Sequence, residues 1–305
     1  MKVISYYSSI PPKNKNFEKN SIIQYFSQGV KRAGDSIQEH KGLNYIPSDV
    51  ALIQGWLHEN SGDAPHIKLR RDVIDGQIKS NKYVITADSN LFLYAVGKEN
   101  HPHHYLRYSA NGVFPNTGNY FDTNVDPTRW KQISADHNIA LKDYRTNGNH
   151  ILICLQRNGG WSMGNLDVMT WLGSVVAHIR KFSDRVIIVR AHPGDKLAQK
   201  YLRIVWPNVY VSKNKDILKD LKNCWAVVTH NSSPTVAAAI EGYPIFVTDP
   251  IRSQCAEIAN IDLSNIENPV LHERQQWAER ISMFHWNFQE LSSGKAWKHI
   301  KEYIK

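Results

Sequence analysis

The chain has 305 residues, of which 42% are hydrophobic and 21% charged, and its formal net charge is +9. This composition is typical of a soluble globular protein and excludes a disordered chain. No apolar run is long enough to span a bilayer, and the first residues lack the hydrophobic segment of a signal peptide. We therefore expect a cytoplasmic protein with no integral membrane association.

The length suits two domains of ordinary size. Cys154, Cys224 and Cys255 are widely spaced and form no disulfide or metal-binding pattern. The positive charge favours a polyanionic partner such as nucleic acid, an acidic glycan or a nucleotide-bearing substrate. Many proteins without such a partner are also basic, so the charge by itself does not decide between these classes.

In the first half, apolar runs predict strands at residues 3–7, 49–56 and 83–87, and helical patterns lie at residues 21–28 and 68–79. Residues 101–129 are rich in Tyr, Asn, Gly and Pro, which predicts long loops with short strands. The turn cluster Thr146-Asn147-Gly148-Asn149 is the best candidate for a linker.

The second half is more regular. It predicts strands at residues 151–155, 185–190, 209–211 and 225–228, with helices at residues 167–181, 216–223 and 236–240. Gly242 and Pro244 end the last helix, and another strand follows. This alternation is typical of a doubly wound parallel sheet, which binds ligands at the carboxyl ends of its strands. From residue 272 to the end the pattern is helical.

We therefore expect an α/β protein with one domain at residues 1–147, a second domain at residues 148–270 and a helical segment at residues 271–305.

Polar loops follow three strands of the second half, and a doubly wound sheet would bring them to one edge. Backbone N–H groups and hydroxyls at a helix start, together with arginine and histidine, are suited to bind a phosphate or diphosphate. Alternatively, Ser232 and Ser233 simply cap a structural helix that starts at Pro234. The candidate phosphate-binding residues are Gln156, Arg157, Arg190, His192, His230, Asn231, Ser232 and Ser233.

The His192-Pro193 loop is followed about forty residues later by a strand, Ser232-Ser233, a helix and Gly242-x-Pro244. This arrangement resembles the nucleotide-binding half of GT-B glycosyltransferases, especially bacterial sialyltransferases, capsular Kdo transferases and glycerophosphotransferases that use CDP-glycerol. The resemblance covers residues 148–250. It implies two Rossmann-like domains facing across a cleft, with an acceptor-binding domain at residues 1–147 and a donor-binding domain at residues 148–270. The C-terminal segment at residues 271–305 would cross back to pack on the first domain. The resemblance also implies that His192 and the two serines hold the donor's phosphate.

Other cofactor classes are poorly supported. Gly159-Gly160 lacks the G-x-G-x-x-G spacing of a dinucleotide site, and no Walker A motif occurs. The histidines of the segment His101-Pro102-His103-His104 are too closely spaced to surround one zinc ion. We expect no metal and no cofactor. The donor would be a nucleotide-sugar, with a UDP-sugar favoured and a CMP-sugar as the alternative.

The catalytic base is expected in the first half. Asp88 follows a predicted strand, at a position similar to the strand-end aspartate of phage DNA β-glucosyltransferase, although the surrounding residues do not match. Asp35 is the rival candidate for the base. The alternative for Asp88 is that it only forms a turn, as aspartates at strand ends commonly do. His192 is a further catalytic candidate, which would help the nucleotide leave. The candidate acceptor-binding residues are Lys31, Arg32, Arg107 and Tyr108.

The sequence therefore predicts a metal-independent glycosyltransferase that moves a sugar from a nucleotide donor to a hydroxyl group. The favoured acceptor is a hydroxylated base in phage DNA, which would have to be flipped out of the duplex. If the protein is viral, its location would be the host cytoplasm. One alternative is a transferase of capsular or lipopolysaccharide synthesis, with the C-terminal Trp- and Lys-rich helix on a membrane surface. Another is a nucleotide- or DNA-binding module without turnover.

Overall fold

The structure is a computed structural model that describes residues 1–11, 17–57, 61–92, 94–95, 104–114, 116–119 and 124–304. The chain forms two compact units, Met1–Asn138 with Glu279–Lys305, and Ile139–Ala278. The predicted boundaries lie at residues 147/148 and 270/271. Within the described ranges, no helix is long and apolar enough to cross a membrane.

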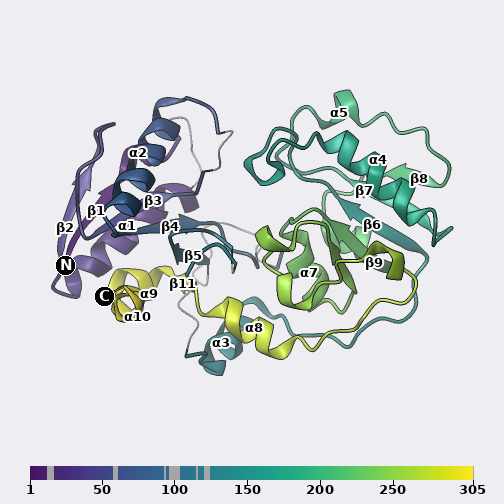
Figure 1. The fold of residues 1–305 in the computed structure, drawn as a ribbon. Coiled ribbons are helices and arrows are strands. Elements are labelled where there is room, and N and C mark those ends of the chain that lie inside the picture. The colour runs from purple at the N-terminus through teal and green to yellow at the C-terminus, as the bar shows by residue number, and fades with distance from the viewer. Residues whose placement is uncertain are drawn as a thin grey trace. The chain divides into compact units, whose positions relative to one another are not determined.

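The first unit is built on a mixed sheet with the strand order β11-β5-β4-β3-β1-β2 (Figure 1). Strands β1 to β4 are parallel to one another, whereas β5 runs antiparallel to both β4 and β11. The strands are β1 (Lys2–Tyr6), β2 (Ser36–His40), β3 (Val50–Gln54), β4 (Tyr83–Asp88), β5 (Tyr105–Ala110) and β11 (His285–Asn287). The helices are α1 (Phe17–Arg32), α2 (Pro65–Lys79), α3 (Pro127–His137), α9 (Phe288–Ser293) and α10 (Lys295–Tyr303).

Alternate residues of each strand bury opposite faces of this sheet. Val3 packs into a core with α1, α9 and α10, whereas its neighbour Ile4 packs into a second core with α2. Gly29 lets α1 approach α9 closely, because a side chain there would meet the carbonyl oxygen of Leu291. Trp297 of α10 is buried in the first of these cores.

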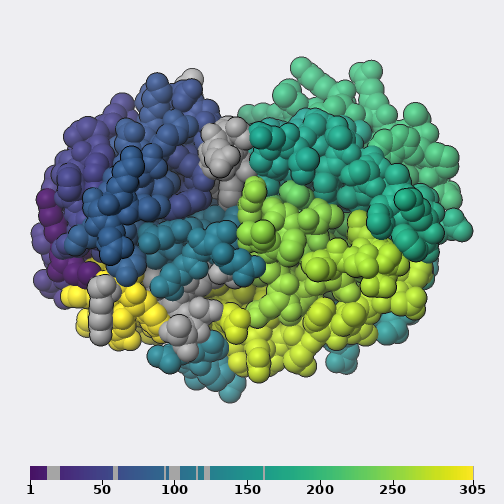
Figure 2. Space-filling model, viewed as in Figure 1, coloured from purple at the N-terminus to yellow at the C-terminus, as the bar shows by residue number. Residues whose placement is uncertain are grey.

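The C-terminal segment therefore packs on the first unit, as expected. In Figure 2 the yellow C-terminal atoms lie against the purple N-terminal region of this unit. Because Trp297 is buried, the apolar face of α10 contributes to the core and is not available as the membrane-binding surface considered above.

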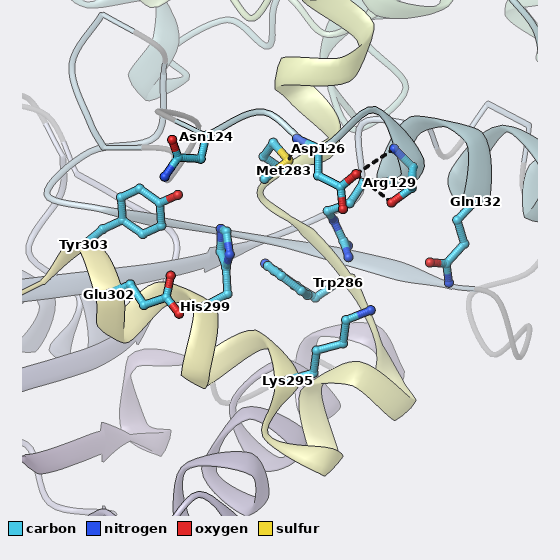
Figure 3. Close-up of a pocket in the computed structure, with 11 residues that line it drawn as sticks. Asn124, Asp126, Arg129, Gln132, Met283, Trp286, Lys295, His299, Glu302 and Tyr303 are labelled. Atoms are coloured by element: carbon cyan, nitrogen blue, oxygen red, sulfur yellow. Dashed lines mark hydrogen bonds between the residues drawn. The ribbon is translucent and has the colours of Figure 1, made fainter.

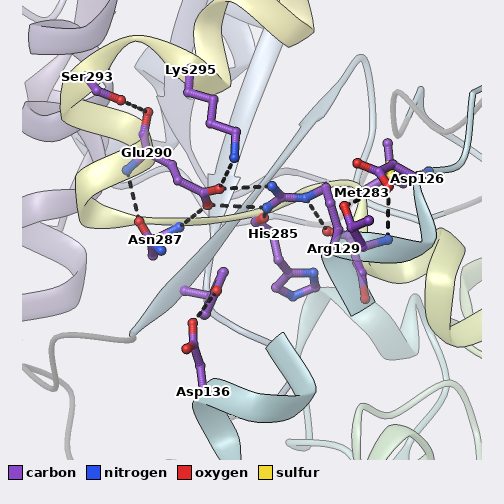
Figure 4. A network of polar contacts seen from close by, with 12 residues as sticks. Asp126, Arg129, Asp136, Met283, His285, Asn287, Glu290, Ser293 and Lys295 are labelled. Atoms are coloured by element: carbon purple, nitrogen blue, oxygen red, sulfur yellow. Dashed lines mark hydrogen bonds and ion pairs between the residues drawn. The ribbon is translucent and has the colours of Figure 1, made fainter. Parts of the chain in front are cut away.

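A buried ionic network fixes this segment in place (Figure 4). Arg129 of α3 donates from Nη1 to Oε1 of Glu290 at 3.0 Å and stacks its guanidinium 3.9 Å from the ring centroid of Trp286. Glu290 also accepts a hydrogen bond from Lys295 and completes a capping box with Asn287 at the start of α9. Arg129 and Glu290 are each nearly inaccessible to solvent, so their charges need one another.

The second unit has a fully parallel sheet with the strand order β10-β9-β6-β7-β8. Its strands are β6 (His150–Cys154), β7 (Val186–Arg190), β8 (Val209–Val211), β9 (Cys224–Thr229) and β10 (Ile245–Val247). Its helices are α4 (Val168–Ile179), α5 (Ala198–Tyr201), α6 (Ile217–Leu221) and α7 (Pro234–Ile240), and α8 (Gln275–Ser282) crosses the boundary between the units. Short 3-10 helices lie in this unit at Trp161–Met163, Pro250–Arg252, Ala256–Ile258 and Leu263–Asn265. Another lies in the first unit, at Tyr7–Ser9.

The structure also contains elements that the sequence patterns did not indicate. The helix α3 lies at the end of a region predicted as loops, and its start is capped by Asp126, which accepts from the Thr128 N–H at 2.9 Å. Strand β11 interrupts a segment predicted as helical throughout, because it is only three residues long and its partner β5 is remote in sequence. Strand β2 is a polar strand at the end of the sheet order and has no apolar run.

Candidate functional site

Three neighbouring strands of the second unit deliver the predicted phosphate-binding loops to one edge of the sheet. Strand β6 lies between β9 and β7 and runs parallel to both, so their carboxyl ends coincide. The side chain of Gln156 donates to Oδ1 of Asn231, which joins the loops after β6 and β9. The backbone N–H of Asn158 donates to Asp195 at 3.0 Å, which joins the loops after β6 and β7. The three loops therefore form one connected polar surface.

His192 is held in one orientation by its own loop. Its Nδ1 accepts the backbone N–H of Gly194 at 3.0 Å, so the neutral ring carries its proton on Nε2. A Cβ at position 194 would lie 3.1 Å from the imidazole ring, which explains why glycine suits this position. Burial, and next the positive charge of Arg157, lower the pKa of His192. At neutral pH His192 is therefore an uncharged donor through its Nε2–H.

The two predicted arginines of this edge differ in their surroundings. Arg190 donates to Asp220 at 2.5 Å and to the backbone carbonyls of Asn214 and Lys215. Its guanidinium is thus engaged in holding the β7 and α6 regions together. Arg157 is exposed, and among the described residues its guanidinium donates no hydrogen bond. Arg157 is therefore the arginine at this edge whose charge is available to a ligand.

The start of α7 differs from the predicted cap. Ser233 occupies the N-cap position but has a right-handed helical backbone conformation (φ −59°, ψ −20°), and its side chain makes no capping hydrogen bond. The carbonyl of Ser232 instead accepts from the N–H and the hydroxyl of Thr235, at 3.2 Å and 2.7 Å. The Thr235 N–H at the helix start is therefore already used within the chain. The helix α7 is also short, with seven residues. What remains for a ligand is the exposed Ser233 hydroxyl and the buried Ser232 hydroxyl.

His230 and Asn231 are held by hydrogen bonds and a close contact with residues that sequence reasoning did not select. Thr248 accepts the indole N–H of Trp171 at 2.9 Å and hydrogen-bonds His230 Nδ1 at 2.8 Å. Asp249 accepts from Asn231 Nδ2 at 3.0 Å, and its carboxylate lies 3.8 Å from His230 Nε2. Burial lowers the pKa of His230.

Thr248 and Asp249 directly follow β10, which runs parallel to β9. They therefore lie at the same edge of the sheet as the three loops. This strand-end position is the signal from which the sequence could have identified them.

A pocket of about 810 Å³ opens beside the His192 loop. Its volume lies in the range of small-molecule sites in proteins. The wall combines apolar groups with two lysines that follow β8. The lining residues are Arg190, Ala191, Pro193, Ala198, Gln199, Leu202, Val211, Ser212, Lys213, Asn214 and Lys215.

In the first unit, Asp88 ends β4 at the carboxyl edge of the parallel strands. Its Oδ2 accepts from Arg107 Nη2 at 2.5 Å, and its Oδ1 accepts from the Ser89 N–H at 2.7 Å. The structure therefore brings together two predicted residues, the base candidate Asp88 and the acceptor candidate Arg107. Because its guanidinium donates this hydrogen bond to the Asp88 carboxylate, Arg107 is a partner of the base candidate more than a free cation.

Asp35 lies at the opposite, amino edge of the same sheet, just before β2. Its carboxylate accepts from the N-terminal ammonium at 2.6 Å, from Trp297 at 2.7 Å and from Lys301 at 2.7 Å. Burial opposes ionisation, but the hydrogen bonds of Lys301, the N-terminus and Trp297 outweigh it and lower the pKa of Asp35 to about 2. These contacts favour a structural role over that of a catalytic base.

The remaining acceptor candidates do not gather around Asp88. Lys31 and Arg32 are exposed at the end of α1, near the amino edge where Asp35 lies. Tyr108 is fully buried, stacks on Phe26 and donates its hydroxyl to the Ile22 carbonyl at 2.6 Å. It is a core residue with no surface for an acceptor.

Within the described ranges, no group of three His, Cys, Asp or Glu side chains is arranged to hold a metal ion. The segment His101-Pro102-His103, considered above for zinc, lies outside the described residues.

No protein-family model matches the chain, and no curated protein matches its sequence. Solved structures do match. The β-Kdo 2,4-transferase of KpsC from Thermosulfurimonas dismutans superposes with a TM-score of 0.54 at 12% identity, covering 96% of this chain and 98% of that one. The β-Kdo 2,7-transferase of KpsC from the same organism gives a TM-score of 0.50 at 13% identity, covering 97% and 99%. The chain therefore has the GT-B fold, with two Rossmann-like domains.

Proposed function

We propose that the chain is a glycosyltransferase that binds the phosphate of a nucleotide-sugar through His192, Arg157, Ser232 and Ser233. The observation that carries this proposal is the orientation of His192. Its Nδ1 is fixed by the Gly194 N–H, which leaves Nε2–H as a neutral donor beside the available guanidinium of Arg157. The pocket beside Ala191 and Pro193 has room for the nucleoside.

These residues suit the chemistry of nucleotide departure. When the bond between sugar and phosphate breaks, negative charge develops on the phosphoryl oxygens. A neutral imidazole N–H, two hydroxyls and a guanidinium stabilise this charge without a metal ion. Thr248 hydrogen-bonds His230, and Asp249 accepts from Asn231. His230 and Asn231 directly precede the two serines, so these contacts keep the donor groups in place.

For the acceptor side we propose Asp88 as the general base. Deprotonating the attacking hydroxyl requires a carboxylate held at a fixed position, and Arg107 Nη2 donates to Oδ2 of Asp88 at 2.5 Å. The hydrogen bonds from Arg107 and Ser89 also orient the carboxylate.

We propose an acidic glycan as the acceptor, as in the alternative of capsular or lipopolysaccharide synthesis. The matching fold of two Kdo transferases and the net charge of +9 support this choice. The DNA acceptor has less support, because Tyr108 is buried and Arg107 is paired with Asp88. The basic residues Lys31 and Arg32 lie toward the other edge of the sheet from Asp88.

The test is release of free nucleotide from a panel of UDP-, CMP- and GDP-sugars, with and without glycan acceptors or hydroxymethylated DNA. We expect one donor to be turned over, and we expect His192→Ala to lower kcat by about 10²-fold or more. His192→Gln should recover part of the activity, because its amide N–H can replace the Nε2–H.

His178→Ala is the matched control, since this histidine is exposed on α4 away from the loops. Unchanged turnover in His192→Ala would contradict the proposed site. Nucleotide binding without any turnover would support the binding-module alternative, and transfer to DNA alone would overturn the glycan acceptor.

A further inference from the structure

The first unit has a pocket of its own at the side of β11 (Figure 3). Its volume is about 370 Å³, which lies at the small end of the range for ligand sites. Residues from the start of α3, from β11 and from α10 form the wall. The lining residues are Asn124, Asp126, Thr128, Arg129, Gln132, Met283, Trp286, Lys295, His299, Glu302 and Tyr303.

Trp286 gives this pocket an unmet hydrogen-bonding requirement. The side chain is 2% exposed, and its indole N–H has no acceptor among the described residues. In Figure 3 the indole nitrogen points toward the side of the pocket formed by His299 and Tyr303. A buried N–H without an acceptor destabilises a protein, so a ligand oxygen that reaches this atom would be favoured.

The aromatic rings of the pocket already pack against one another and against Arg129. The guanidinium of Arg129 lies over the Trp286 ring, and His299 packs at 5.2 Å between ring centroids. Tyr303 continues the row at 5.1 Å from His299. A ligand therefore meets the edges of these rings and their polar atoms, and it is recognised by hydrogen bonds more than by stacking.

The charges of the pocket select against an anion. Arg129 and Lys295 are both committed to Glu290, and Asp126 is committed to the N-cap of α3. Glu302 is exposed on α10 and has no ion pair or hydrogen bond to another described residue. The uncompensated charge at the pocket is thus negative, which disfavours carboxylate or phosphate ligands.

The free polar groups both donate and accept. Asn124 carries an amide without hydrogen bonds to other described side chains, and Glu302 offers a carboxylate. Both lie on the side of Trp286 toward which its indole nitrogen points (Figure 3). Together with the Trp286 N–H they match a ring that bears several hydroxyls, each of which donates and accepts. We propose that this pocket binds a single neutral sugar unit, either free or within a glycan.

This inference goes beyond the proposed transferase activity, because the binding is measured without a nucleotide donor. Transfer could fail while the sugar still binds, and the sugar could fail to bind while nucleotide is still released. The two proposals are therefore tested separately.

The experiment uses the ¹⁵N-labelled full chain and the indole N–H signals of its nine tryptophans. Trp286→Phe identifies the Trp286 signal, and methyl glucoside, methyl galactoside, methyl mannoside and N-acetylglucosamine are titrated in turn. We expect the Trp286 signal to shift with at least one sugar and the other indole signals to stay unchanged. Trp286→Phe should bind that sugar about fivefold more weakly, the effect of one lost neutral hydrogen bond.

Two exposed variants support the test should Trp286→Phe not fold. Asn124→Ala should weaken binding about fivefold, whereas Gln289→Ala, on α9 and outside the pocket, should not. Wild-type protein should prefer at least one of the neutral sugars over glucuronate by about threefold or more, and Glu302→Gln should reduce this preference. The proposal is overturned if no neutral sugar moves the Trp286 signal at millimolar concentration, or if glucuronate binds more tightly than the neutral sugars.

Discussion

Hydrogen bonds with the backbone set the tautomer of two histidines, His192 and His285. His192 accepts from Gly194, which leaves Nε2 as the donor of the proposed phosphate site. His285 uses both ring nitrogens: Nδ1 donates to the Ile281 carbonyl at 2.7 Å, and Nε2 accepts the Leu91 N–H at 3.2 Å. Both rings are therefore neutral, one to meet a ligand and the other to support the core.

The neutral His285 predicts a pH dependence of stability. Burial lowers the pKa of His285 well below the usual value of 6.5. Below pH 6.5 the unfolded chain therefore binds a proton at this residue that the native state does not bind. The free energy of unfolding should therefore fall on acidification below pH 6.5, by about 1.4 kcal/mol per pH unit from this residue.

Urea unfolding of wild type and His285→Asn between pH 5 and 7 measures this slope. The variant should show a slope smaller by about that amount, whatever its absolute stability. Equal slopes in the two proteins would show that His285 is not responsible.

At the scale of elements, the contact between α3 and the C-terminal segment is the least expected part of the fold. Strand β11 pairs with β5, and Arg129 of α3 reaches Glu290 of α9 beside it. The network joins segments about 160 residues apart in sequence. It thus ties the end of the chain into the first unit.

Glu290→Gln should destabilise the protein by about 3–5 kcal/mol, because it leaves the buried guanidinium of Arg129 without its counter-ion. Lys295→Ala is the internal control, since Lys295 pairs with the same carboxylate but is 61% exposed. Its loss should cost less than about 1 kcal/mol. Chemical denaturation compares the two variants, and similar losses would contradict the role assigned to the buried pair.

The elements that the sequence predicted correctly are those with strong local patterns. The strands of the second unit are apolar runs between polar loops, so their order along the chain followed from the alternation. Strand β11 has no such pattern and exists because β5 is there to pair with it.

The same limit applies to single residues. The polar loops containing His192, Arg157 and Ser232 could be selected, because each follows a strand. The ion pair between Arg190 and Asp220, thirty residues apart, could not be read from either residue. The burial of Tyr108 and the contact between Asp35 and Trp297, 262 residues apart, likewise depend on tertiary packing.

At the scale of the whole molecule, each unit presents polar side chains at the carboxyl edge of its parallel strands. The second unit has neutral and cationic donors there, and the first has the pair of Asp88 and Arg107. A transferase needs both a site that stabilises a leaving phosphate and a base for the acceptor. The GT-B fold with these two edges is the framework for the proposed reaction.

The most direct test of this account is calorimetric titration of the full chain with UDP, CMP, CDP, GDP and ADP. We predict that one of them binds, and that His192→Ala weakens its affinity by about tenfold or more, as expected for the loss of a hydrogen bond to a charged group. His178→Ala should bind as wild type does. Absence of binding by all five nucleotides at millimolar concentration, or equal affinity in His192→Ala, would contradict the proposed donor site.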